Sequence, residues 1–162
     1  MRSYEHRIDI DASPAIVWAQ TIDVESWPQM FPTVTSVERL DDGPLRVGSR
    51  ARIKQPGQPH RVWTVATIEP EHRFVWTTQA NGFAMMGAHV LTPTTVGGTV
   101  NHLMIDVDGP LARLVAALAG RKLRKTLAIE NEGFRTAARA SEPVGRLRRV
   151  GRFERLDLVG RQ

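Results

Sequence analysis

The chain has 162 residues, a length that predicts one domain with a substantial hydrophobic core. It contains no cysteine, which excludes disulfides and thiolate metal sites and fits a cytoplasmic protein. The net charge is +5, but residues 141–162 carry +3 of it, so the basic balance gives little support for a specific nucleic-acid partner. No run of about 18 apolar residues and no signal-peptide pattern occurs, so no transmembrane segment is expected.

The first part of the chain predicts one strand followed by two short helices. Residues 4–10 alternate between apolar and polar side chains, which is the pattern of a half-buried strand. Asp11, Ser13 and Pro14 then supply the cap and first-turn residues of a helix. A second short helix is expected in the segment VESWPQMF, where Pro32 ends it.

Six further strand signals follow, separated by turn segments. These turns are DDGP, QPGQP, EPEH, ANG and PTTVGG. The Asn81-Gly82 pair is the strongest hairpin signal, and a two-residue turn there places residue 76 opposite residue 87. Consecutive strands joined by tight turns predict an antiparallel sheet. The predicted strands are 34–40, 49–54, 61–69, 73–79, 83–92 and 99–107.

A long helix is predicted from the Gly-Pro break at 109–110 to residue 140, because this stretch contains no further proline. Gly120 is the expected position of a bend. One long helix lying across an antiparallel sheet is an α+β arrangement. The stripe on one face of the helix consists of Leu123, Leu127, Glu130 and Phe134.

Residues 1–140 are predicted to form a single domain, and residues 141–162 a basic tail. The tail contains too many apolar residues for a purely solvating segment, while its three glycines argue against a rigid helix. A disordered appendage, a docking helix and an arm for anionic surfaces remain alternatives.

Several segments share their type, order and spacing with one protein superfamily. They are IDIDASPAIVWAQTIDVESWPQMFP, the strand pair RVWTVATIEP and FVWTTQANG, and the closing GPLARL…ENEGFRTAARA. On these segments the chain resembles the START-like, helix-grip (SRPBCC) superfamily, and especially its polyketide cyclase/dehydrase branch. The resemblance implies a seven-stranded antiparallel sheet curled around the C-terminal helix, with a deep cavity between them. It also implies a small apolar ligand such as a lipid, an isoprenoid or a polyketide. No cofactor is expected.

The same resemblance indicates which residues line the cavity. Trp27 and Phe31 fall where aromatase/cyclase relatives place cavity aromatics, although an ordinary core position is an equal alternative. The strand alternation of the family sends Ala84 and Met86 inward, which leaves room for a mostly apolar pocket of roughly a few hundred Å³. The residues expected to line it are Trp27, Phe31, Trp63, Val65, Thr67, Thr77, Met86, Ala88, Val90, Asn101, Leu103, Leu123, Leu127, Glu130 and Phe134.

Glu130 is the candidate catalytic group, since burial in the apolar stripe would raise its pKa. The alternative is that Glu130 pairs with an arginine at the edge of the cavity. Two departures from the catalytic relatives count against an enzyme. Thr67 is followed by Glu69 where they carry an arginine, and Val34 stands where they carry a tyrosine.

The histidines offer one metal-site hypothesis. If residue 92 lies opposite residue 99, His89 faces His102, and the two imidazoles could begin a zinc site. No third ligand is apparent in the sequence, and a structural zinc site usually needs four. No metal is therefore expected.

Two strand alternations compete for residues 73–92. In the family's alternation Phe74, Trp76 and His89 point outward, and the tail or a homodimer partner would cover Trp76. In the opposite alternation these residues line the cavity together with His102.

Three functional interpretations follow. The leading one is a cytoplasmic protein that binds, and by extension transports, a small apolar ligand in an internal cavity. The second is a polyketide cyclase/dehydrase-type enzyme that uses Glu130 with Thr67, Thr77 and Asn101. The third is an interaction module that uses the arginine-rich tail.

Overall fold

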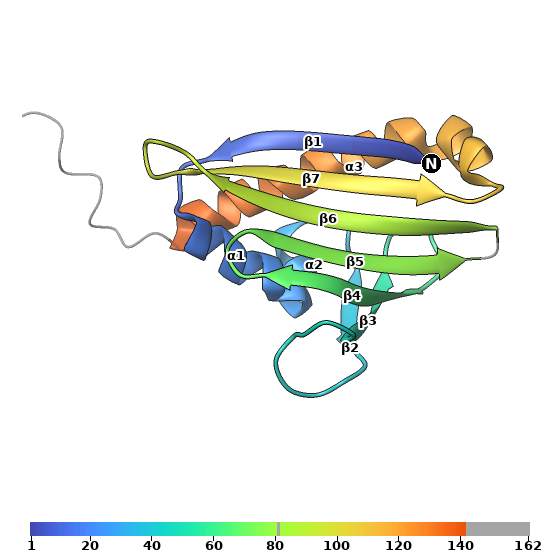
Figure 1. Ribbon diagram of the computed structural model, residues 1–162, viewed down its shortest axis with the longest axis horizontal. Helices are drawn as coiled ribbons and strands as arrows, with labels where there is room; N and C mark the ends of the chain where they lie inside the picture. The colour runs from blue at the N-terminus through green and yellow to red at the C-terminus, as the bar shows by residue number, and fades with distance from the viewer. Residues whose placement is uncertain (81, 142–162) are drawn as a thin grey trace, which may run out of the picture.

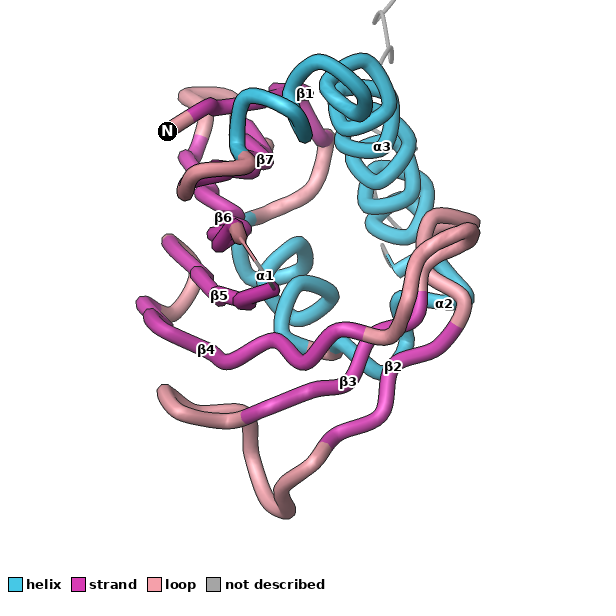
Figure 2. Tube along the Cα trace, turned by 90° about the vertical axis from the view of Figure 1, so that its right-hand side faces the viewer, coloured by secondary structure: helices cyan, strands magenta, loops and turns pink. Residues whose placement is uncertain are grey.

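Seven antiparallel strands form one sheet that curls around a long C-terminal helix in the computed structural model (Figures 1 and 2). The structure describes residues 1–80 and 82–141. The order across the sheet is β1-β7-β6-β5-β4-β3-β2. The strands are β1 (Arg2–Ile10), β2 (Ser36–Arg39), β3 (Arg50–Lys54), β4 (Arg61–Glu69), β5 (Arg73–Ala80), β6 (Phe83–Pro93) and β7 (Thr99–Asp108). The predicted α+β class and the seven strands are confirmed.

Short helices connect β1 to β2, and a long helix follows β7. The short ones are α1 (Pro14–Ile22) and α2 (Trp27–Met30), with a single 3-10 turn between them. Pro14 lies in the first turn of α1, where its missing N–H costs no hydrogen bond. The long helix α3 (Ala112–Ser141) lies on the concave side of the sheet (Figure 2). Of the predicted tail, residues 141–162, Ser141 is the last residue of α3, and residues 142–162 lie outside the described residues, so the tail stays a prediction.

Gly120 lies inside α3, where the sequence suggested a bend. A Cβ at this position would lie 3.0 Å from the Tyr4 hydroxyl oxygen of β1. The missing side chain therefore lets α3 approach the edge strand closely, which gives a packing reason for a glycine in mid-helix.

The turn between β5 and β6 sets the predicted register. Trp76 lies opposite Gly87, as a two-residue Asn-Gly turn requires. The register between β6 and β7 differs from the prediction by one residue, because Pro93 continues the strand and lies opposite Thr99. The loop is shorter than expected, and its ends are joined by a hydrogen bond in which Thr94 N–H donates to the Gly98 carbonyl.

A bulge changes the alternation of β4. Val65 lies opposite Trp76, whereas Thr67 lies opposite Val75, so the register shifts between these positions. A bulge places an extra residue in one strand, and side chains beyond it change face. Trp63 and Val65 therefore point inward and Thr67 points outward.

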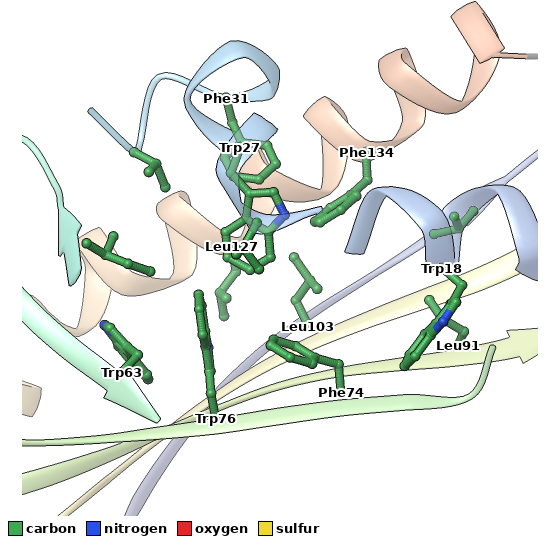
Figure 3. Packing of buried hydrophobic residues seen from close by; sticks show 14 of the residues in the cluster. Trp18, Trp27, Phe31, Trp63, Phe74, Trp76, Leu91, Leu103, Leu127 and Phe134 are labelled. Atoms are coloured by element: carbon green, nitrogen blue, oxygen red, sulfur yellow. The ribbon is translucent and has the colours of Figure 1, made fainter. Parts of the chain in front are cut away.

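Contacts between rings decide which face of β5 is inside, because Phe74, Val75 and Trp76 are all buried. The Trp76 ring centre lies 4.9 Å from that of Trp27 in α2, and the Phe74 ring centre lies 5.8 Å from that of His89. Trp76 and Phe74 point toward the concave side, where α3 lies (Figure 3), and the His89 ring centre lies 5.6 Å from that of Phe134 in α3. The alternation taken from the family is therefore wrong for β5 and β6. The opposite alternation is confirmed for Phe74, Trp76 and His89, but it is wrong for His102, which lies opposite Val90 on the outer face.

Several residues predicted to line the cavity lie on the outer face instead. Thr77 is exposed and lies opposite Met86, and Val90 lies opposite Arg73. Successive residues of a strand point to opposite faces, so the inward position of Trp76 fixes these side chains outside. The residues wrongly placed inside are Thr67, Thr77, Ala84, Met86 and Val90.

The C-terminal half of α3 packs against α2 through Gly133. A Cβ on Gly133 would lie 2.7 Å from the Met30 carbonyl oxygen and 2.6 Å from Phe31 Cδ1. Both distances are far below van der Waals contact, and the carbonyl belongs to the backbone and cannot rotate away. The two helices touch at this point only because residue 133 has no side chain.

Replacing Gly133 with alanine is therefore expected to lower the free energy of unfolding by about 1–3 kcal/mol, although alanine favours helices. Urea unfolding followed by tryptophan fluorescence measures the change. Thr136→Ala, at an exposed position one turn later, is the matched control and should change stability by no more than about 0.5 kcal/mol. A Gly133→Ala variant as stable as this control would contradict the close packing.

Candidate functional site

An internal cavity of about 70 Å³ lies between the concave face of the sheet, α2 and α3. Its walls include three tryptophans: Trp27 from α2, Trp63 from β4 and Trp76 from β5 (Figure 3). Leu103 of β7 and Leu127 of α3 contribute the aliphatic part of the wall. The cavity is smaller than predicted, because the strand alternation brings indole and imidazole rings inside where alanines were expected.

The aromatic rings around the cavity form a continuous cluster. Trp76 packs between Trp63 and Trp27, with ring centres 5.1 and 4.9 Å away. Trp27 also contacts Phe31 at 5.7 Å, and Phe31 contacts Phe134 at 5.3 Å. Tilted and edge-on pairs at such separations add stability beyond simple burial. One wall of the cavity is thus a stiff aromatic surface built from α2, β4, β5 and α3.

A larger apolar groove adjoins the cavity. Its volume is about 410 Å³, and it shares Met85, Leu123 and Thr126, among others, with the lining of the cavity. The helix contributes Leu114 and Leu118, whose side chains are 53% and 79% exposed. The groove therefore offers an apolar route from the surface to the cavity.

Glu130 reaches the cavity from α3 and is partly buried. The Thr33 hydroxyl donates a hydrogen bond to Glu130 Oε1 at 2.9 Å. Loss of hydration raises the pKa of the Glu130 carboxyl to about 7, and the bond from Thr33 opposes that shift. Glu130 is partly buried, as predicted. No described residue forms a salt bridge with it, so the alternative, a pairing with an arginine, is not found among the described residues.

His89 reaches the same cavity from β6, as the opposite strand alternation predicts. Its ring centre lies 5.3 Å from that of Trp27 and 5.6 Å from that of Phe134. Burial among these rings lowers the pKa of His89 to about 3, so the imidazole is neutral at physiological pH. His89 Nδ1 is buried without a hydrogen-bond partner among the described residues. Unpaired buried polar atoms are uncommon and often mark functional positions.

A buried amide network fixes α3 against two strands. Asn101 of β7 donates through Nδ2 to Asn131 Oδ1 at 2.8 Å, and Asn131 Nδ2 donates to the His6 carbonyl of β1 at 3.0 Å. Both asparagines are fully buried. Because Asn131 is bound on both sides, the turn of α3 that carries Glu130 has a defined orientation.

Apart from Ala88, the residues predicted for the site divide into three groups. The first lines the cavity: Trp27, Trp63, Leu103, Leu123, Leu127 and Glu130. The second lies buried around it: Phe31, Val65, Asn101 and Phe134. Ala88 also borders the cavity beside Gly87, although its position in the alternation belongs to the outer face. The third group, Thr67, Thr77, Met86 and Val90, lies on the outer face, and those predictions are wrong.

The predicted site did not include Thr33, and it included Trp76 and His89 only under the opposite strand alternation. The inward position of Trp76 and His89 follows from the Asn-Gly turn once a single side chain of β5 is known to point inward. Thr33 lies in the loop after α2, where no periodic pattern exists.

Because Trp76 is 5% exposed under Trp27 and Trp63, it needs no cover from a tail or a second subunit, and that prediction is wrong.

The metal hypothesis also fails on the register. His89 lies opposite Leu103, and His102 lies on the other face, where its Nε2 is 2.8 Å from Glu5 Oε2. Within residues 1–80 and 82–141, no three histidine or acidic side chains converge as metal ligands.

None of the helices in the same part of the chain is long and apolar enough to cross a membrane.

Comparisons with known proteins agree with this architecture. The family described as "Polyketide cyclase / dehydrase and lipid transport" matches residues 1–139. A Streptomyces halstedii protein named "Putative polyketide cyclase" is 34% identical over 80 residues, which are 48% of this chain and 70% of that protein. A hypothetical protein of Helicobacter pylori superposes with a TM-score of 0.74 at 12% identity, over 85% of this chain and 88% of the other. The ZhuI aromatase/cyclase of Streptomyces sp. R1128 gives 0.64 at 18% identity, over 86% and 98%.

Proposed function

Because this chain belongs to the polyketide cyclase / dehydrase and lipid transport family, we propose that its cavity binds a small, mostly apolar molecule that carries an oxygen function. The observation that carries the proposal is the pairing of an aromatic wall with two polar groups, Glu130 and His89. Ligand sites commonly combine an apolar lining with a few polar groups that fix orientation.

The two polar groups suit a neutral oxygen on the ligand. With a pKa of about 7, Glu130 is partly protonated at neutral pH and can donate to a carbonyl or accept from a hydroxyl. His89 is neutral, so one ring nitrogen donates and the other accepts. An anionic ligand group would lose its hydration in this cavity without an opposite charge to replace it, because His89 is neutral and Glu130 is neutral or negative. The aromatic rings favour a flat or ring-containing apolar body.

The cavity is too small for a whole lipid or polyketide. At about 70 Å³ it takes only part of such a molecule, and the adjoining groove of about 410 Å³ takes the rest. The bound molecule would therefore extend from Glu130 and His89 outward past Met85 and Leu123. Native mass spectrometry of freshly purified protein is the most direct test. A carried-over molecule with an apolar body and a neutral oxygen is the expected result, and a strongly charged hydrophilic molecule would contradict the proposal.

Gly87→Ala tests the position of the site. A Cβ on Gly87 would lie 2.6 Å from Trp76 Nε1 and 3.4 Å from Ile105 Cδ1, so the indole must shift toward the cavity. We expect the affinity for an uncharged naphthylamine probe to fall by about tenfold, because the displaced ring occupies the chamber. Quenching of tryptophan fluorescence measures the binding.

Ala84→Val adds comparable bulk to the outer face of the same strand and serves as the control. It should leave probe binding unchanged. Equal losses in both variants would mean that the probe binds elsewhere or that the sheet itself is disturbed.

One observation favours an enzyme as the second candidate. Glu130 and His89 line one cavity, and burial moves their pKa values in opposite directions, a pattern that acid–base sites share. Thr67 and Thr77 no longer belong to this hypothesis, since both lie on the outer face. If the carried-over molecule is converted by the parent protein, Glu130→Gln should keep its binding and lose the conversion. A molecule that the parent binds but never converts would leave binding as the function.

A further inference from the structure

A second concave surface lies outside the proposed ligand cavity, between the edge strand β1 and the first half of α3. Its volume is about 420 Å³, and four of its lining residues are Arg2, Arg113, Arg121 and Arg124. Figure 1 shows the start of β1 beside the first turns of α3, which brings residues from the two ends of the domain together. We call this surface the basic groove.

The charge of the basic groove is not balanced by the protein around it. No aspartate or glutamate occurs among the described residues that line it. None of its four arginines forms a salt bridge with a residue in the described part of the chain. Like charges gathered around a hollow repel each other, and an anion placed between them removes that repulsion.

Two features give the basic groove a defined shape. The guanidinium of Arg124 lies 5.4 Å from the centre of the Tyr4 ring, a cation–π contact that restrains this long side chain. Gly120 lies beneath it and leaves room for Tyr4. Because β1 is an edge strand, part of its backbone N–H groups has no partner within the sheet and can also donate.

We propose that the basic groove binds an anionic ligand through its phosphate groups. Guanidinium groups match phosphate oxygens with paired hydrogen bonds, which makes arginine the preferred side chain for such ligands. Arg113 and Arg124 are eleven residues apart, or about 16 Å along a helix, so the groove offers places for more than one phosphate. A free phosphorylated molecule and an anionic lipid headgroup share this chemistry.

A charge-matched pair of double variants tests the proposal on the full chain. Arg113→Gln combined with Arg121→Gln removes two charges from the groove and leaves the Arg124 contact with Tyr4 intact. Arg73→Gln combined with Arg139→Gln removes two exposed charges elsewhere. Thermal unfolding of both variants checks that each remains folded.

Pyrophosphate and vesicles of phosphatidylcholine, with and without phosphatidic acid, serve as probes for the two sources. Pyrophosphate is measured by calorimetry, and NMR shifts of the Tyr4 and Gly120 amides locate its site. Vesicle binding is measured by cosedimentation. The groove variant should bind the effective probe at least about tenfold more weakly than the parent, and the control variant should match the parent to within about twofold.

Each outcome decides the question. Binding of pyrophosphate that is lost in the groove variant indicates a free phosphorylated ligand. Binding only to vesicles with phosphatidic acid, lost in the same variant, indicates a lipid headgroup. The proposal is overturned if the parent binds neither probe, or if both double variants lose binding equally, since net charge alone would then explain the attraction.

Discussion

Replacing Phe134 with alanine is expected to lower the free energy of unfolding by about 3–5 kcal/mol. The side chain is completely buried, and its ring centre lies within 5.3 Å of Phe31 and 5.6 Å of His89. Removing the ring leaves a void between α2, α3 and β6 that the stiff rings around it cannot fill. Urea unfolding measures the change.

Phe83→Ala is the control for the same chemical change. Phe83 is only partly buried, at the start of β6, and its ring faces the guanidinium of Arg61 at 5.1 Å. Its loss should cost less than half as much as that of Phe134, because less apolar surface returns to water. Similar losses of unfolding free energy in Phe134→Ala and Phe83→Ala would contradict the tight packing of Phe134 between α2, α3 and β6.

The Glu130→Gln variant is expected to become more stable than the parent as the pH rises. Folding raises the pKa of Glu130 from 4.5 to about 7, so the folded state favours the neutral acid. Its contribution to stability is therefore complete below pH 4.5, falls as the pH rises from there, and levels off above about 7. A shift of this size corresponds to at most about 3 kcal/mol. Glutamine does not ionise and avoids this loss.

Urea unfolding at several pH values from acidic to mildly alkaline measures the effect. The two proteins should be similar near pH 4 and differ by up to about 3 kcal/mol near pH 8. His89 also titrates on unfolding, but it is present in both proteins, and its effect cancels in the difference. Glu132→Gln, which changes an exposed carboxylate two residues away, should follow the parent. Parallel curves for the parent and Glu130→Gln would mean that Glu130 stays hydrated.

The same pH dependence bears on the proposed function. A ligand oxygen that accepts a hydrogen bond from the protonated Glu130 carboxyl binds best below pH 7, where the carboxyl is neutral. A ligand hydroxyl that donates a hydrogen bond to the Glu130 carboxylate binds best above pH 7. The direction of the pH effect on affinity therefore shows whether the ligand presents a hydrogen-bond acceptor or a hydrogen-bond donor to Glu130, even before the structure of the ligand is known.

Features that depend on residues close together in the chain were predictable from the sequence. The Asn-Gly turn fixed the register of β5 against β6, since a two-residue loop allows only one pairing. The stripe of Leu127, Glu130 and Phe134 predicted the inner face of α3, because helical spacing places these positions on one side. Burial of Glu130 followed from that stripe alone.

Which face of the sheet is inside depends on contacts between elements that are distant in the chain. Phe74, Val75 and Trp76 are consecutive, apolar and all buried, so either alternation satisfies the hydrophobic pattern. The choice belongs to α2 and α3, which pack on one side and bring Trp27 against Trp76. The bulge near Thr67 shifts the register of β4 against β5 by one residue, and the shorter loop after Pro93 shifts that of β6 against β7 by one residue from the prediction. Because side chains along a strand alternate, a shift of one residue exchanges the two faces, and the local sequence carries no signal strong enough to prevent it.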